Sequence, residues 1–196
     1  MKTQKEFFNM KAENWDEKQN ISVQNCRKLI KECQLSNDQV VLDVGTGTGV
    51  LIPFFLAGDL KELKIFAIDY AEKMVEKLIS KNYPKNVIPM VADIHSTNFP
   101  DNTFDRIIAN ACYPHFEKKE IALNEIYRIL KKGGFFIISH LWGREHINRF
   151  HKKTHQIVSK DMIPPIPELK SFIEGLGFKY VDGTDDTDYF FVKFTK

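Results

Sequence analysis

Several features that would point away from an ordinary globular protein are missing from this sequence. The longest apolar stretch, Val50–Ala57, is too short to span a bilayer and contains Pro53. Residues 1–18 alternate basic and acidic side chains and contain no apolar signal core. The formal net charge is only +2, which gives no general reason to expect nucleic acid or an anionic membrane as partner. We therefore expect a cytoplasmic protein without a membrane span.

Cysteine is also scarce, with 3 residues in a chain of 196. Cys26 and Cys33 fall in a segment with helical periodicity, which places their Cα atoms roughly 10 Å apart, beyond the reach of a disulfide. Cys112 stands alone, and the paired spacing typical of zinc sites does not occur. The cysteines therefore indicate a reducing compartment and no metal site.

The chain has the size of a single domain, and 43% of its residues are hydrophobic. Short β-branched apolar runs alternate with amphipathic helical patterns. The expected strands are Val40–Val44, Lys64–Ile68, Val87–Val91, Phe104–Ala109 and Phe135–Ser139, and the expected helices are Ser22–Leu35, Val50–Ala57, Ala71–Lys81 and Lys118–Leu130. This alternation predicts a parallel sheet covered by helices on both faces.

The end of the chain breaks the alternation. Two further strands, Phe178–Val181 and Tyr189–Phe194, flank an acidic turn at 182–188 and predict a hairpin. The predicted fold is α/β, a doubly wound seven-stranded Rossmann-like sheet with the last strand antiparallel and a small helical cap. Within one domain we predict an N-terminal cap and helix (1–35), a cofactor-binding core (36–141), an inserted lid (142–163) and a C-terminal helix and hairpin (164–196).

The segment from Val40 to Gly49 is the most informative stretch. A buried strand leads into three glycines at alternate positions and then into a helix. Glycine is needed where the backbone turns sharply and where a ligand lies against it. Val50 stands where a dinucleotide fingerprint needs its third glycine, and the loop has no lysine to reach a phosphate, which excludes a P-loop.

Polar side chains close the strands that follow. Asp69 comes 24 residues after Gly45, and a carboxylate there can accept hydrogen bonds from both hydroxyls of a ribose. Asp93 and Asn110 close the next two strands. Because ligands bind outside the carboxyl ends of parallel strands, these residues predict one common site, although each acid alone could simply cap a helix.

Five motifs in sequence order resemble those of class I S-adenosylmethionine-dependent methyltransferases, most closely the small-molecule branch that includes the ubiquinone and menaquinone biosynthesis methyltransferases. They are Val-Leu-Asp-Val-Gly-Thr-Gly-Thr-Gly (41–49), Ala-Ile-Asp-Tyr (67–70), Ala-Asp-Ile (92–94), Phe-Pro-Asp-Asn-Thr-Phe-Asp (99–105) and Leu-Lys-Lys-Gly-Gly (130–134). The resemblance covers about residues 5–141. It implies an enzyme that uses S-adenosyl-L-methionine and releases S-adenosyl-L-homocysteine. A phosphate-free sulfonium agrees with the lysine-free loop and the acidic strand ends.

The resemblance also implies a role for each matching residue. The implied cofactor-binding residues are Asp43, Gly45, Thr46, Gly47, Asp69, Tyr70, Met74, Ala92, Asp93, Ile94, Asn110 and Ala111. The first four would hold the methionine end, and Asp69 would bind the ribose. Tyr70, Met74, Asp93 and Ile94 would surround the adenine. Asn110 and Ala111 would form the floor beneath the sulfonium.

The chemistry of methyl transfer indicates what the acceptor site must do. It must hold the acceptor in line with the methyl group and away from water. A general base helps when the acceptor is a hydroxyl, a thiol or an acidic carbon. His115 and His140 are the candidate bases, and each could equally be a capping or packing residue. The candidate substrate-binding residues are Trp15, Tyr113, Arg149, His151 and His155.

The predicted lid, 142–163, carries an apolar stripe at helical spacing and many more basic than acidic residues. In the resembling family such an insert covers the acceptor pocket, and its charge would favour an anionic acceptor such as a carboxylate or phosphate. A solvated basic face is the alternative. His151 and His155 share a helix face and could bind a metal with His140 or His146, but no recognisable metal motif supports this.

Three other functions stay open. A protein of the same fold could bind S-adenosylmethionine without catalysis. An RNA or tRNA methyltransferase would need a continuous basic face, and Ala111 and Cys112 stand where amino-methyltransferases of nucleic acids carry prolines. A nicotinamide-dependent oxidoreductase would share the opening strand, loop and helix. The acceptor molecule and the oligomeric state are not predicted.

Overall fold

A computed structural model describes residues 3–18, 21–58, 60, 62–154 and 156–196. Its seven strands form one sheet in the order β3-β2-β1-β4-β5-β7-β6. The strands are β1 (Val40–Val44), β2 (Lys64–Asp69), β3 (Val87–Val91), β4 (Phe104–Asn110), β5 (Leu130–His140), β6 (Lys179–Asp185) and β7 (Phe190–Thr195). The first five are parallel, and β7 runs antiparallel to both of its neighbours. The predicted fold class and hairpin are confirmed.

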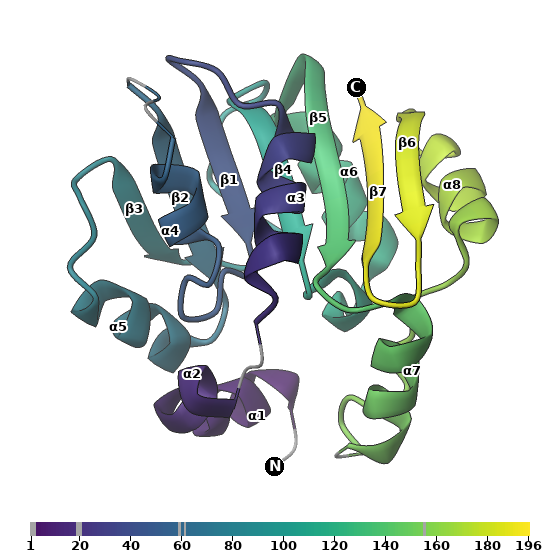
Figure 1. The fold of residues 1–196 in the computed structure, drawn as a ribbon. Coiled ribbons are helices and arrows are strands. Elements are labelled where there is room, and N and C mark those ends of the chain that lie inside the picture. Colours follow the sequence, from purple (N-terminus) through teal and green to yellow (C-terminus); the bar gives the residue numbers. More distant parts are fainter. Residues whose placement is uncertain (1–2, 19–20, 59, 61, 155) are drawn as a thin grey trace.

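Helices cover both faces of the sheet because successive side chains of its buried strands point to opposite sides. Val41 and Ile108 pack with α3 (Val23–Cys33), α4 (Ile52–Leu56) and α5 (Glu72–Ser80). Leu42 and Ile107 pack on the other face with α6 (Lys119–Ile129) and α8 (Ile166–Glu174). Figure 1 shows α3 and α4 in front of the sheet and α6 behind it.

Two groups of helices lie beyond the carboxyl edge of the parallel strands (Figure 1). The N-terminal group comprises α1 (Gln4–Lys11), the 3₁₀ turn η1 (Ala12–Asn14) and α2 (Trp15–Lys18), and α7 (Arg144–Lys153) lies on the other side. Helix α7 confirms the predicted helix of the insert. The short turn η2 (Tyr113–His115) follows β4 at the same edge. The carboxyl edge is therefore flanked by chain segments from both halves of the sequence.

Three predicted boundaries are wrong. The helix expected at Val50–Ala57 is shorter, because the turn of the glycine loop continues through Leu51. The strand expected at Phe135 starts at Leu130 and bulges at 131–134, where Gly133 adopts a left-handed φ of 74°. The acidic segment expected as a turn is mostly strand, because Gly183 and its neighbours pair with β7 along the exposed edge. Of the helices described, none has the length and apolar character needed to cross a membrane.

Candidate functional site

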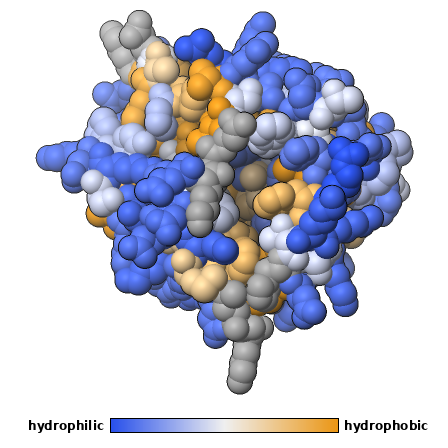
Figure 2. Space-filling model, turned by 60° about the horizontal axis from the view of Figure 1, so that its bottom comes forward, coloured by the Kyte–Doolittle hydropathy of each residue, from blue (hydrophilic) through white to orange (hydrophobic). Residues whose placement is uncertain are grey.

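A cavity of about 590 Å³ opens at the carboxyl edge, between the N-terminal helices and α7. Figure 2 shows apolar side chains gathered around a hollow on this face, with hydrophilic ones around them. Most of the predicted site residues line it. They are Trp15, Gly45, Thr46, Gly47, Asp69, Tyr70, Met74, Ala92, Asp93, Ile94, Asn110, Ala111, His115, His140 and His151. The structure therefore brings residues from many separate segments to one place.

The glycine loop forms one wall, and its backbone conformation requires glycine. Gly45 and Gly47 have left-handed φ values of 62° and 56°. A Cβ on Gly45 would lie 2.5 Å from Cβ of Cys112, which no real contact permits. The Cys112 thiol donates to the carbonyl of Val44 at 3.0 Å, and burial raises its pKa well above the usual value. Cys112 thus packs behind the loop as a neutral thiol.

Asp69 ends β2 and anchors the loop. One carboxylate oxygen accepts from the backbone N–H of Gly47 at 2.9 Å, and the other accepts from that of Ala71 at 2.8 Å. Burial raises the pKa of Asp69, while these backbone hydrogen bonds favour its charged form. The backbone N–H of Tyr70 also favours the charged carboxylate, and the four lone pairs of a carboxylate leave it the capacity to accept a further hydrogen bond from a ligand.

Asp43 lies deeper and does not line the cavity. Its carboxylate accepts from the Thr46 hydroxyl at 2.7 Å. Burial, reinforced by the charge of Asp69, raises the pKa of Asp43 to about 7. Asp43 therefore stabilises the glycine loop through its hydrogen bond with Thr46.

The adenine-binding residues that the motifs imply lie together at the β2 and β3 side. Tyr70, Met74 and Ile94 line the cavity there, and Asp93 is exposed at its margin. The Asp93 carboxylate accepts from the backbone N–H of His95 at 2.9 Å. This surface offers an aromatic ring, apolar side chains and a carboxylate within one wall.

The N-terminal helices are tied to the glycine loop, which sequence spacing did not reveal. The Thr48 hydroxyl donates to the Asp16 carboxylate. Lys81 lies 2.8 Å from the other oxygen of Asp16 and donates to the carbonyl of Thr48 at 2.7 Å. Trp15 is held next to Gly47, since its Nε1 lies 3.7 Å from the position of a Cβ there. The N-terminal segment is thus a built part of the cavity wall.

Three histidines occupy the opposite end. Nδ1 of His115 lies 2.7 Å from the Asp161 carboxylate, and Nδ1 of His151 is hydrogen-bonded to the Asp161 backbone carbonyl. Burial lowers the pKa of His151. His140, at the end of β5, is only 3% exposed, and burial together with the two other imidazoles lowers its pKa to about 3. Within the described residues, its Nε2 has no hydrogen-bond partner.

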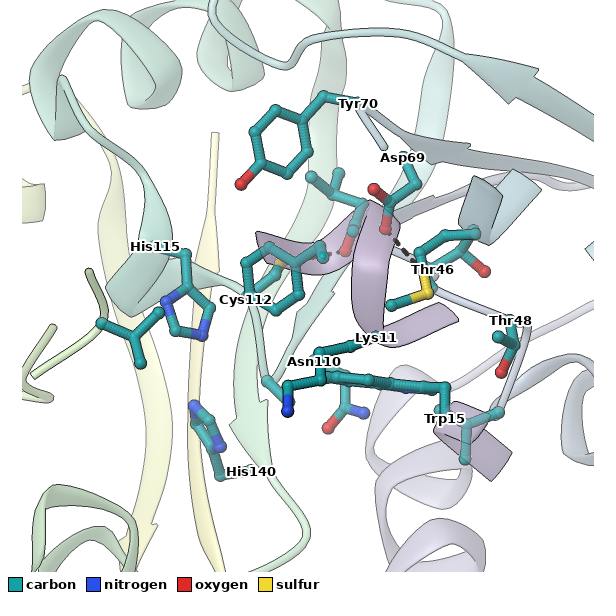
Figure 3. A pocket seen from close by; sticks show the side chains of 18 of the residues that line it. Lys11, Trp15, Thr46, Thr48, Asp69, Tyr70, Asn110, Cys112, His115 and His140 are labelled. Atoms are coloured by element: carbon teal, nitrogen blue, oxygen red, sulfur yellow. Dashed lines mark hydrogen bonds between the residues drawn. The ribbon is translucent and has the colours of Figure 1, made fainter. Parts of the chain in front are cut away.

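Asn110 and Ala111 lie between the two ends. The Ser139 hydroxyl donates to the Asn110 side-chain oxygen at 3.0 Å, and the N–H of Ala111 donates to the Ser139 carbonyl at 2.8 Å. Ala111 has a left-handed φ of 57°, an uncommon conformation for a residue with a Cβ. Figure 3 shows Asn110 and Lys11 between the histidines on one side and Asp69 and Thr46 on the other.

Two predicted substrate residues do not line the cavity. Arg149 is exposed outside it, and Tyr113 is buried and faces a second groove beside α8. His155 falls outside the described residues. The structure adds lining residues that were not among the predicted cofactor, catalytic or substrate residues, namely Phe7, Phe8, Lys11, His146 and Phe150. No group of three or more His, Cys, Asp or Glu side chains in the described ranges could hold a metal ion.

Comparison with known proteins agrees with the motifs. Residues 42–138 match a family model described as a methyltransferase domain. The ubiquinone/menaquinone biosynthesis C-methyltransferase UbiE of Coxiella burnetii is 32% identical over 124 residues, which cover 60% of this chain and 50% of that protein. Demethylmenaquinone methyltransferase of Bacteroides fragilis is 30% identical over 149 residues, 74% of this chain and 60% of the relative. The chain therefore spans about half to three-fifths of the length of these relatives.

A solved structure extends the agreement to the fold. A SAM-dependent methyltransferase from Aquifex aeolicus is 25% identical, with a TM-score of 0.70, and the match covers 87% of this chain and 88% of that one. Because the match covers 87% of this chain, it extends beyond residues 42–138 in both directions.

Proposed function

On the premise that this chain carries the methyltransferase domain of the family that its motifs resemble, we propose that it is an enzyme that transfers the methyl group of S-adenosylmethionine to a small-molecule acceptor. The cofactor supplies a methyl group activated by a positively charged sulfur. The observation that carries the proposal is the continuity of one cavity from the glycine loop and Asp69 to the three histidines.

The residues at the glycine loop fit this cofactor. Asp69 is fixed by two backbone N–H groups and keeps acceptor capacity for ribose hydroxyls. The absence of a side chain at Gly45 and Gly47 lets a ligand approach the backbone. No lysine follows in the loop, which suits a ligand without phosphate. We propose that the cofactor lies along this wall, with the sulfonium above Asn110 and Ala111.

A small-molecule acceptor agrees with the size and walls of the cavity. Its volume of about 590 Å³ is in the range of small-ligand pockets. Aromatic side chains from the N-terminal helices and α7, among them Phe8, Trp15 and Phe150, line it. These walls favour a planar, largely apolar acceptor, and two relatives carry names from quinone biosynthesis.

An anionic acceptor has less support than the sequence indicated. Arg149, Lys152 and Lys153 of α7 are exposed and lie outside the cavity lining. Lys11 is the one lysine or arginine among the described lining residues. The basic residues of the lid therefore fit a solvated face better than a charged acceptor pocket.

Calorimetric titration tests the cofactor, and an acceptor assay tests the reaction. We expect saturable binding of S-adenosylmethionine and of S-adenosylhomocysteine, and no binding of NADH. Mass spectrometry would then detect a methylated product with demethylmenaquinol as a first acceptor to try. Binding of NADH in place of S-adenosylmethionine would support the oxidoreductase alternative and contradict the proposal. Tight cofactor binding with no product from any of a broad set of hydroxylated aromatic compounds would favour a non-catalytic binding protein.

A further inference from the structure

The histidine end of the cavity is organised around one residue of the insert, Asp161. Its carboxylate oxygen Oδ2 lies 2.7 Å from Nδ1 of His115, and its backbone carbonyl is bonded to Nδ1 of His151. Carboxylate and carbonyl oxygens only accept hydrogen bonds. Both Nδ1 atoms must therefore carry the proton in these contacts, which leaves Nε2 of each neutral ring with a free lone pair.

Asp161 is itself held in place. The side-chain amide of Gln4, on α1, donates to the same carboxylate oxygen at 2.9 Å. The contact joins the N-terminal helices to the insert across the cavity. The His115 ring also contacts the rings of Phe8, at 5.2 Å between ring centroids, and His151, at 5.1 Å. The ring of His115 is therefore held both by a hydrogen bond and by contacts with neighbouring rings.

His140 completes this end. Figure 3 shows its ring directed toward that of His115, into the same part of the cavity. Because burial and the other two imidazoles hold the pKa of His140 to about 3, the ring is neutral at physiological pH. Its Nε2 is deeply buried and has no hydrogen-bond partner within the described residues. A buried polar atom without a partner is costly, and a ligand group could satisfy it.

We propose that Asp161 is a positioning residue that fixes His115 in the tautomer with a proton-accepting Nε2, so that the cavity takes an acceptor presenting a neutral O–H or N–H group. The part of this proposal that concerns the acceptor rests on the proposed methyl transfer. The proton of the O–H or N–H group passes to Nε2 of His115. The lone pair of the oxygen or nitrogen forms the bond to the methyl carbon, and the electron pair of the broken S–CH₃ bond stays on sulfur.

The charges of this step balance within the site. The positive charge of the sulfonium is lost as sulfur becomes a neutral thioether, and an equal charge appears on the His115 imidazolium. That cation lies against the Asp161 carboxylate, where a charge-assisted hydrogen bond stabilises it. Because an anionic acceptor would need no such proton transfer, the arrangement distinguishes a neutral acceptor from a carboxylate or phosphate.

Nitrogen-15 spectra of the full-length protein with labelled histidine test the tautomer directly. At alkaline pH, where an ordinary imidazole is neutral, His115 of the wild type should be protonated at Nδ1. In Asp161→Ala it should shift to the Nε2-protonated form that free histidine prefers. Asp161→Asn should restore the wild-type pattern, because an amide oxygen can accept from both Gln4 and His115.

Asp185→Ala is the matched control. Asp185 pairs with Arg144 at the start of α7, with 2.6 Å between the charged atoms, and does not contact the histidines. This variant loosens the insert without touching the tautomer contact, so its spectrum should match the wild type. A wild-type His115 protonated at Nε2, or an unchanged tautomer in Asp161→Ala, would overturn the proposal. A shift in Asp185→Ala as large as that in Asp161→Ala would also overturn it.

Phenol and benzoate, added with S-adenosylhomocysteine present, test the acceptor class. Phenol should move the His115 Nε2 resonance saturably, with about fivefold weaker binding in Asp161→Ala, as expected for loss of one hydrogen bond. Benzoate should leave the resonance unchanged. Saturation by benzoate, or no response to phenol, would contradict the neutral O–H acceptor. If the tautomer is as proposed but S-adenosylmethionine does not bind, the proposed function fails and the positioning role of Asp161 stands.

Discussion

The two ends of the cavity bury ionisable groups of opposite kinds. At the glycine loop, Asp43 and Asp69 are buried carboxylates whose pKa values are raised by burial. At the far end, His140 and His151 are buried imidazoles whose pKa values are lowered by burial. In both cases removal from water disfavours the charged form. The acids nevertheless receive backbone or hydroxyl donors, whereas Nε2 of His140 receives none that the structure describes.

This difference indicates how the two ends work. The polar groups of the loop end are already hydrogen-bonded before any ligand binds, as expected of a preorganised site. The histidine end holds a buried polar atom without a partner among the described residues and is lined by side chains from α1 and α7, which suits a ligand that completes the site on binding.

The largest effect is an opposite pH dependence of stability. Because its pKa is raised in the folded state, Asp43 contributes stability that is fully present below about pH 4. This contribution is lost as the pH rises through about 7. Because its pKa is lowered in the folded state, His140 contributes stability that is fully present above about pH 6.5. This contribution is lost as the pH falls toward 3. Each slope is on the order of 1.4 kcal/mol per pH unit, so the two oppose one another in the wild type.

Urea unfolding between pH 4 and 6.5 would expose each slope. Asp43→Asn should make the free energy of unfolding fall more steeply on acidification, because the contribution of Asp43 no longer opposes that of His140. His140→Gln should reverse the sign and make the protein more stable on acidification. Parallel pH profiles for wild type and both variants would show that neither group is buried as described.

Gly45→Ala should destabilise the fold by about 3 kcal/mol and abolish cofactor binding. The added Cβ meets Cys112 in a left-handed backbone conformation. Gly133→Ala is the matched control, since Gly133 also has a left-handed φ but no heavy atom within 4 Å of an added Cβ. It should cost only the backbone strain, about 1 kcal/mol, and leave cofactor affinity unchanged. Equal losses in thermal unfolding would rule out the clash at Gly45.

Asp69→Ala should weaken S-adenosylmethionine binding by roughly 1–3 kcal/mol, because ribose hydroxyls lose their acceptor. Asp182→Ala changes an exposed acid on β6 and should leave the affinity unaltered. Calorimetry of the folded variants measures both. Wild-type affinity in Asp69→Ala would remove this carboxylate from the ribose site.

Asp16→Ala should have the smallest effect, a loss of about 1 kcal/mol in cofactor affinity. The change removes the acceptor of Thr48 and the partner of Lys81, and so frees α2 from the glycine loop. Asp185→Ala loosens the other side of the cavity and should not change cofactor affinity. A larger loss in Asp185→Ala than in Asp16→Ala would mean that the insert, and not the N-terminal segment, closes over the cofactor.

The sequence predicted the sheet and the loop end well because strands impose a period of two and end at a common edge. Val40–Val44 and its glycines fix where the chain turns, and Asp69 follows from the same geometry. The roles of these residues in cofactor binding, and the division of the chain into cap, core, lid and tail, stay predictions.

The histidine end could not be read in the same way. Asp161 lies 46 residues from His115, and no periodicity connects a loop of the insert to a 3₁₀ turn after β4. The rotational orientation of α7 about its axis places Phe150 and His151 in the cavity wall and Arg149 outside it. Tyr113 turned to the second groove because η2 is a tight turn and not a continuation of the strand.

A crystal structure with S-adenosylhomocysteine bound would show which end of the cavity holds the nucleoside. We expect the ribose hydroxyls on the Asp69 carboxylate and the sulfur directed toward His115 and His140. A nucleoside seated among the histidines, or a ribose without contact to Asp69, would contradict this placement.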